Sequence, residues 1–443
     1  MSNKKIKCIK PILVCAVILI QQVVLAQNIE IESVEQAMEI AIRNNIDYQN
    51  YLLHEKRAVS EYKQSKKYQL PDISGSFSGQ KNHELATTPL PGEVFGVPGQ
   101  TIEAQFGQEY TYNAGITISK ELINRQANLQ LKLSNLNTES KKAETALFKQ
   151  MLKEQVIRYY YTGIIAEKAI SLSENELENA LKINVITVKR HEEGLEDMIA
   201  VNNARINENF VHQNLNSNKQ LLLQCQSELK KLLGMESKDT LVLKGELNYD
   251  THSSFNISQF RESPTLKTVD IQKQQADLQV KLSRSYLLPT IQLNSYFGKQ
   301  QFRDDFGLKF SENAWSDYSY TSLSVSVPIF TGFNNRSKIK QNKYNQQIAV
   351  NEKQQAEKHS HIDDMRLIRE YELSIADADN AREQFYLYDQ NRKLYFQKYE
   401  EGLIGLENYL SIFQEYIKAE NAYLNAISKA YIYFSQISPI IMY

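Results

Sequence analysis

Four short stretches of this chain alternate between apolar or small residues and polar residues. Residues 72–80 and 110–119 flank a segment rich in proline and glycine, and residues 290–298 and 318–327 flank a polar loop. A period of two over nine or ten residues is typical of a β-strand with two unlike faces. The pattern therefore predicts two strand pairs, the first of them joined by a long loop.

Helical patterns fill almost all of the remaining chain. No proline occurs within residues 99–263 or 329–438, and glycines are rare in both stretches. The pattern predicts helices over residues 33–68, 122–190, 196–233, 264–286, 334–399 and 405–436. Apolar residues recur every three or four positions, as in coiled coils. In residues 122–190 they predict a core stripe of Leu129, Leu133, Leu136, Ala143, Leu147, Met151, Val156, Tyr160 and Ile164.

The predicted helix lengths fit one another. At a rise of about 1.5 Å per residue, residues 122–190 span roughly 100 Å, while residues 33–68 and 196–233 together span roughly 110 Å. One long helix can therefore be lined by two half-length helices laid end to end. The second half of the chain approximates the same relation.

The chain is an internal duplication. The order helix, strand pair, long helix, helix runs through residues 27–233 and again through residues 264–443. Residues 234–263 form a linker that contains the strand-like segment Thr240–Leu243. The tetrapeptide Glu-Glu-Gly-Leu marks the same point in each copy, at residues 192–195 and 400–403. Because glycine permits a tight reversal, each tetrapeptide predicts the turn of a long helical hairpin.

Residues 1–26 have the pattern of a cleavable secretory signal, with four lysines, a short apolar run and the box Val24-Leu25-Ala26. An uncleaved anchor is the alternative, although the apolar run is short for one. Cleavage removes no acidic residue and leaves 47 basic residues against 52 acidic ones, a net charge of −5. This balance argues against a nucleic-acid partner. The one remaining cysteine, Cys225, lies among leucines and is expected in the core.

Candidate chemistry is sparse. Neither glycine-rich nucleotide-binding motif occurs, and no nucleophile lies in an elbow motif. His359 and His361 are two residues apart, which on a helix turns them about 200° from each other. A solvated helix face is therefore favoured over a metal site. We expect no enzymatic activity, no metal site and no cofactor.

The strands have the length of tilted transmembrane β-strands, although a strand of a soluble sandwich can show the same pattern. Export, the polar loops at one end and tyrosines near the strand ends favour the membrane. A barrel needs about eight strands or more, and an open edge in lipid would leave backbone groups unpaired. Several chains must then share one barrel. The tyrosines are Tyr68, Tyr110, Tyr112, Tyr286, Tyr296, Tyr318 and Tyr320.

In their order and duplication, four motifs make the chain resemble the TolC-like outer-membrane efflux proteins. They are the opening segment 34–45, the Tyr-x-Leu-Pro segments at 68–71 and 286–289, the segment 327–333 and the two Glu-Gly-Leu turns. The resemblance implies a mainly α fold with a small β part. It also implies a homotrimer whose chains share a twelve-stranded barrel in outer-membrane lipid and a periplasmic α-helical tunnel.

The resemblance further implies that the protein is the exit duct of a tripartite efflux or type I secretion system, with a periplasmic adaptor and an inner-membrane transporter as partners. The alternative is a periplasmic coiled-coil adaptor or scaffold that spans no membrane. A soluble exported hydrolase would need a catalytic constellation, which the sequence does not suggest. The exported substrate cannot be read from the chain.

Two sets of site residues follow from the resemblance. Family members meet their adaptor at helix turns of this type, which assigns docking to Glu193, Gly194, Leu195, Glu401, Gly402 and Leu403; a turn without a partner is the alternative. Some members close the tunnel with an aspartate ring just past the second turn. The matching positions here are Asn408 and Ser411, with Ala200 and Asn203 in the first repeat and Glu407 nearby. We therefore expect a polar or weakly acidic mouth with a modest preference for cations.

Overall fold

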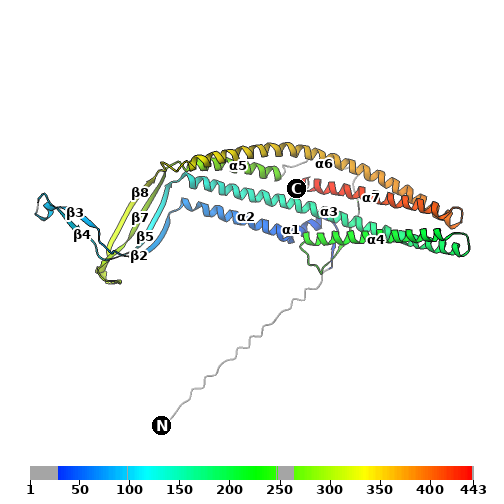
Figure 1. Ribbon diagram of the computed structural model, residues 1–443, viewed down its shortest axis with the longest axis horizontal. Helices are drawn as coiled ribbons and strands as arrows, with labels where there is room; N and C mark the ends of the chain where they lie inside the picture. Colours follow the sequence, from blue (N-terminus) through cyan, green and yellow to red (C-terminus); the bar gives the residue numbers. More distant parts are fainter. Residues whose placement is uncertain (1–27, 97, 246, 248–263, 442–443) are drawn as a thin grey trace, which may run out of the picture.

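The computed structural model is elongated, with a β-sheet at one end and long helices running from it to two hairpin turns at the other (Figure 1). It describes residues 28–443 except 97, 246, 248–263 and 442–443, so the predicted signal and much of the linker lie outside the described residues. The helices are α1 (Val34–Asn44), α2 (Ile46–Ser65), α3 (Arg125–Glu192), α4 (Met198–Leu232), α5 (Pro264–Ser285), α6 (Asn334–Glu400) and α7 (Leu406–Ile441). The strands are β1 (Asn28–Ile31), β2 (Asp72–Lys81), β3 (Thr87–Pro91), β4 (Thr101–Gln105), β5 (Tyr110–Ile123), β6 (Thr240–Leu243), β7 (Thr290–Arg303) and β8 (Ser316–Ser326).

The four predicted strands form one antiparallel sheet in the order β2-β5-β7-β8. Two strands are longer than their alternation suggested, because β5 continues to Ile123 and β7 to Arg303. The extensions are polar or irregular, yet their backbone groups still pair; Arg303, for example, lies opposite Tyr110. Pairing with a neighbouring strand, which alternation does not report, sets the strand ends.

The register places unlike residues on the two faces of this sheet. Since residues two apart share a face, the pairing collects exposed apolar side chains on one side and mainly serine, threonine and asparagine on the other. The apolar face includes Ile73, Phe77, Ile116, Phe297, Leu323 and Val325. Tyr296, Tyr318 and Tyr320 belong to the polar face.

Tyr296 and Tyr320 lie opposite each other in mid-strand, with their ring centroids 5.8 Å apart. The expectation that these two tyrosines mark the strand ends is therefore wrong. The Tyr296 ring fills space over the paired glycines Gly115 and Gly298, where added Cβ atoms would stand 2.5 Å and 2.6 Å from its hydroxyl oxygen.

The segment expected as a long loop between β2 and β5 contains a second hairpin. β3 and β4 pair antiparallel, with Leu90 opposite Ile102, and extend outward from the loop end of the sheet (Figure 1). The prolines and glycines lie mostly in the turn of this hairpin, where Gly96 has a φ of 79°. The strong turn signals concealed two strands of only five residues each.

The helices continue the order of the strands, so that α2, α3, α5 and α6 lie side by side (Figure 1). Each chain segment passes from helix to strand or from strand to helix with few intervening residues, which transfers the sheet order to the helices. Further from the sheet, α4 extends the line of α2 along α3, and α7 extends the line of α5 along α6. The prediction of long helices lined by half-length ones is confirmed.

The helix predicted over residues 33–68 is broken at Asn45, which has an extended ψ of 118°. Its side chain accepts from Tyr48 N at 2.9 Å, which caps α2, and donates to Leu232 O at 3.1 Å near the end of α4. Asparagine favours such caps because its side chain competes for backbone groups. The break thus joins three helix ends.

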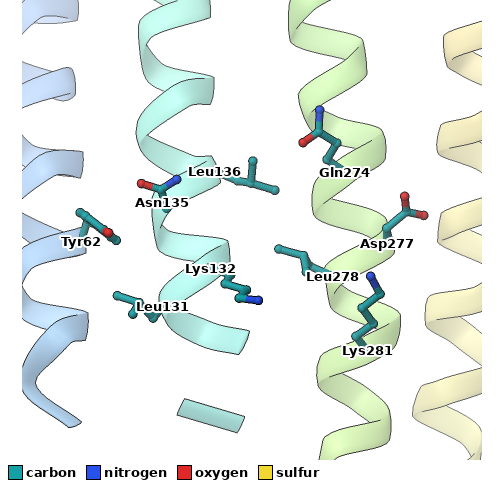
Figure 2. Close-up of a pocket in the computed structure, with 9 residues that line it drawn as sticks. All are labelled: Tyr62, Leu131, Lys132, Asn135, Leu136, Gln274, Asp277, Leu278 and Lys281. Carbon is teal, nitrogen blue, oxygen red and sulfur yellow. The ribbon is translucent and has the colours of Figure 1, made fainter. Parts of the chain in front are cut away.

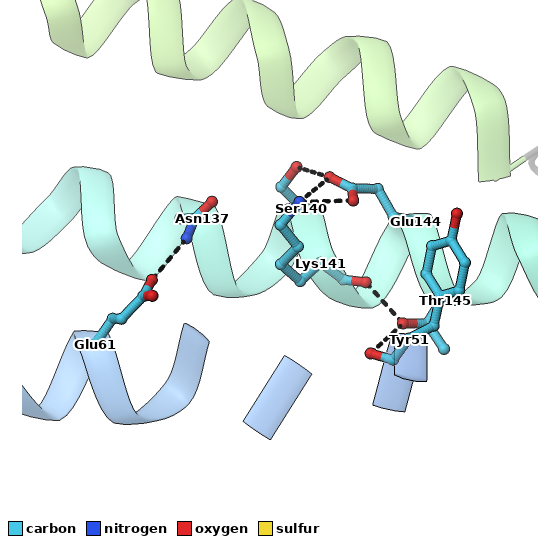
Figure 3. A network of polar contacts seen from close by, with 7 residues as sticks. All are labelled: Tyr51, Glu61, Asn137, Ser140, Lys141, Glu144 and Thr145. Atoms are coloured by element: carbon cyan, nitrogen blue, oxygen red, sulfur yellow. Dashed lines mark hydrogen bonds and ion pairs between the residues drawn. The ribbon is translucent and has the colours of Figure 1, made fainter. Parts of the chain in front are cut away.

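Polar contacts contribute to the packing of α2 on α3. Asn137 donates to Glu61 and Thr145 donates to the Tyr51 carbonyl, both at 3.5 Å (Figure 3). Lys141 and Glu144 form an ion pair at 2.7 Å along α3 in the same region. The two bonds between the helices supplement the packing of α2 on α3.

The core confirms most of the predicted stripe in α3, but Met151 is 48% exposed and Leu152 is buried in its place. A straight helix of 3.6 residues per turn drifts against a heptad pattern, which moves the buried face by one position here. Cys225 is buried, as expected. The predicted strand Thr240–Leu243 is confirmed as β6, which pairs parallel with β1. None of the helices that the structure describes is long and apolar enough to cross a membrane.

Candidate docking tips and channel mouth

The two Glu-Glu-Gly-Leu segments form the same helix-ending turn. Gly194 and Gly402 adopt left-handed φ values of 74° and 77°. Leu195 N donates to Arg190 O at 2.8 Å, and Leu403 N donates to Lys398 O at 2.9 Å. This pattern is the Schellman motif, in which glycine takes the left-handed position and the following amide bonds back across the last turn. The predicted reversals are therefore built by local backbone bonds.

The residues around each glycine are available to a partner. The leucine side chains are 71% exposed at Leu195 and 68% exposed at Leu403, and Glu193 and Glu401 are exposed as well. Each turn thus presents a leucine beside carboxylates at the end of the molecule furthest from the sheet (Figure 1). An exposed apolar residue on a rigid turn is suited to anchoring a partner.

A contact between the two tips of the chain was not anticipated from the sequence. Nη2 of Arg190 in α3 donates to the carbonyls of Tyr399 at 2.6 Å and Glu400 at 3.2 Å in α6. The guanidinium carbon lies 4.5 Å from the Tyr399 ring centroid, and the Tyr399 hydroxyl bonds Thr187 at 2.9 Å. We call this set of contacts the tip clasp. The sequence gives one hint of this contact, an arginine four residues before Gly194.

A row of stacked aromatic residues continues from the tip clasp along α7, away from the tips. Tyr399 stacks on Tyr409 at 6.0 Å, Tyr409 on Phe413 at 5.9 Å, and Phe413 on Tyr416 at 6.2 Å. All four side chains, from α6 and α7, are buried in a core cluster to which α3 and α4 also contribute. Burial raises the pKa of Tyr409 to about 12, so its phenol stays neutral through the physiological range.

The mouth candidates divide into two groups. Asn203, Glu407 and Ser411 line one groove of about 630 Å³ between α4 and α7. Asn408 is exposed on α7 and does not line this groove. Ala200 is 9% exposed and packs in the tip core, so its side chain is not available to a mouth. Nearby, Asp197 caps α4 by accepting from Ala200 N at 2.9 Å.

Closer to the sheet, a groove of about 440 Å³ lies among α2, α3 and α5 (Figure 2). Its lining mixes leucines with charged groups that are partly engaged, such as Asp277, which pairs with Lys273 at 2.6 Å. In the part of the chain that the structure describes, no three His, Cys, Asp or Glu side chains gather as a metal site. The two tips and the groove between α4 and α7 beside them remain the candidate functional site.

Comparison with solved structures supports the fold. The VceC outer membrane protein of Vibrio cholerae matches with a TM-score of 0.76 and 14% identity, over 92% of this chain and 96% of that one. The Campylobacter jejuni CmeC channel matches with a TM-score of 0.74 and 16% identity, over 92% of this chain and 85% of that one. The open-state Neisseria gonorrhoeae MtrE channel also matches with a TM-score of 0.74 and 16% identity, over 92% of this chain and 88% of that one.

Sequence comparison identifies the family. No protein of curated function matches the chain. The family model described as outer membrane efflux protein matches residues 37–235 and 259–432, which is most of the chain and includes both repeats. The chain therefore belongs to the outer membrane efflux protein family.

Proposed function

We propose that three copies of this chain form an outer-membrane channel that serves as the exit duct of a tripartite efflux or type I secretion system. The observation that carries the proposal is the four-stranded sheet, whose exposed apolar face ends at two edge strands, β2 and β8. In lipid, such edges must pair with other strands, because no water is present to bond their backbone groups. Three copies joined edge to edge give a closed twelve-stranded barrel.

The helices support the same closure. Since α2, α3, α5 and α6 repeat the strand order, α2 with α4 and α6 form the two edges of the helical layer. Both edges carry exposed large apolar side chains, which suits contact with the next copy. They include Ile46, Leu53 and Leu223 on one edge and Tyr344, Ile348, Leu373 and Leu394 on the other.

The test is fractionation followed by conductance. We expect a trimer in the outer-membrane fraction that dissociates to single chains, each lacking residues 1–26, only after heating. The purified protein should open pores in a planar bilayer. A periplasmic adaptor or scaffold would instead leave the membrane fraction on salt washing and conduct no current. That result would refute the channel.

The tips are the proposed docking rim for a periplasmic adaptor, with six tips in each trimer. The exposed leucines would insert between partner helices, flanked by Glu193 and Glu401. We expect Leu195→Glu with Leu403→Glu to abolish efflux from cells that hold the adaptor and transporter, and Gly194→Trp or Gly402→Trp to do the same. Trimer abundance in the membrane is the control, and full drug resistance with normal trimer levels would contradict docking at the tips.

The mouth is proposed to be polar and weakly acidic, formed by Asn203, Glu407, Asn408 and Ser411. With one carboxylate per chain in this set, the pore should prefer cations modestly. Single-channel reversal potentials in a salt gradient measure that preference, which Glu407→Gln should reduce. Strong block by divalent cations would contradict a mouth that is only weakly acidic.

A further inference from the structure

Two carboxyl groups face each other inside the helical layer. Glu176 of α3 and Glu420 of α7 are each 3% exposed and lie within hydrogen-bonding reach of one another. Glu176 lies 16 residues before the end of α3, and Glu420 lies 14 residues into α7. At about 1.5 Å per residue, both are roughly 20–25 Å from the tips.

The surrounding groups do not neutralise two negative charges. Arg392 of α6 faces the pair, but its Nη2 is bonded to Asp389 at 2.7 Å, and Asp389 also pairs with Lys393 at 2.6 Å. The Tyr416 hydroxyl lies within bonding reach of Glu420. The titratable groups around the pair are thus Asp389, Arg392 and Lys393 of α6 and Tyr409 and Tyr416 of α7.

The oxygen atoms of the pair indicate its protonation state. Glu176 Oε1 and Glu420 Oε2 are buried and lack a hydrogen-bond partner among the described residues. Two carboxylates cannot bond each other because both only accept, whereas a carboxylic acid can donate to a carboxylate. Two buried like charges in contact are also strongly unfavourable. One shared proton removes both problems.

We propose that Glu176 and Glu420 form a proton-binding site that holds one shared proton at neutral pH, and that release of this proton in alkaline medium weakens the packing of α3 on α7. The site is independent of the channel proposal, since it lies within one chain. It would make the tip half of the helical layer sensitive to pH.

The direction of the pH effect follows from linkage. Burial raises the pKa of both carboxyls, and the partner carboxyl raises that of Glu176 further. The unfolded chain loses these protons near the ordinary carboxyl value of 4.5, so above that pH the folded chain binds more protons. Stability contributed by the pair is therefore complete below about pH 4.5 and falls as pH rises, until the folded pair has released its proton.

Thermal unfolding of the full-length protein in detergent tests this dependence between about pH 5 and about pH 10. In Glu420→Gln, a neutral amide replaces the protonated partner and can donate to Glu176. The folding constant of wild type should fall relative to this variant by up to about tenfold per pH unit within the window. Glu178→Gln, on the exposed side of α3, is the matched control and should follow wild type. Parallel curves for wild type and Glu420→Gln would overturn the proposal.

Infrared spectroscopy provides a second test, whose decisive measurement is made on the wild type. At neutral pH the wild type should show the C=O stretch of a buried carboxylic acid, which should disappear in alkaline medium. The band should persist in Glu178→Gln and be lost in Glu420→Gln. A wild-type protein without this band at neutral pH would refute the shared proton.

Discussion

Replacing Arg190 by alanine should release the two tips of one chain from each other. Arg190 reaches from the end of α3 to the end of α6, where it bonds two backbone carbonyls and covers the Tyr399 ring. The variant loses all three contacts while the bond between Thr187 and Tyr399 remains. The tips should then separate more often without the helices unfolding.

The size of this effect follows from the contacts. A hydrogen bond from a charged donor contributes about 1.5–3 kcal/mol, and a cation–π contact at a partly exposed site about 0.5–1 kcal/mol. Arg190 is half-buried and one nitrogen serves both carbonyls, so the lower ends apply. A loss of about 2–3 kcal/mol should reduce the ratio of joined to separated tips by roughly 30- to 150-fold.

Pulsed electron paramagnetic resonance can measure the separation. Spin labels at Leu195→Cys and Leu403→Cys, both exposed positions, would report the tip distance in a Cys225→Ser background. The parent should give a narrow distribution, and Arg190→Ala a broader and longer one. Arg205→Ala, at an exposed position on α4, is the control and should match the parent. If Arg190→Ala also matched it, the tip clasp would not hold the tips together.

Three further changes test the local structure. Gly402→Ala should cost about 1 kcal/mol in thermal unfolding because its φ is 77°; Gly402→Asn should cost less, and equal losses would contradict the reasoning. Asn45→Ala should cost about 2 kcal/mol by removing the α2 cap and the bond to α4. Asn45→Asp, which keeps the cap acceptor, should lose less stability. An Asn45→Ala variant as stable as the wild type would contradict the role of Asn45 in joining α2 to α4. Gly115→Ala should lower the yield of folded protein, since its Cβ would stand 2.5 Å from the Tyr296 hydroxyl oxygen. Gly75→Ala, in open space in the same sheet, should not, and equal yields would exclude a steric role.

The strands show how far alternation reaches. It located all four sheet strands because a sheet with unlike faces needs a period of two. It missed the ends of β5 and β7 and the whole β3–β4 hairpin, because those strands are held by backbone pairing between mostly polar or exposed residues. It also left open which tyrosines share a face, which depends on the register between strands.

At the candidate site, the sequence located the turns and missed the clasp. Glycine within a duplicated tetrapeptide marks a reversal, since the bonds that build it lie within six residues. Arg190 and Tyr399 are 209 positions apart, and no local pattern predicts that they touch. Likewise, Ala200 seemed equivalent to a mouth residue by alignment, but the packing of α4 buries its side chain.

The sequence alone determines what depends on neighbours a few residues away: helix length from the spacing of apolar residues, strand position from alternation, and turns from glycine. Tertiary structure decides what depends on distant partners, namely the sheet order, the tip clasp and the meeting of Glu176 with Glu420. The physical reason is the separation along the chain of the residues that each interaction brings together. Backbone bonds and helical periodicity act between near neighbours, whereas burial and the contact of two carboxyls arise only after α3, α6 and α7 have packed.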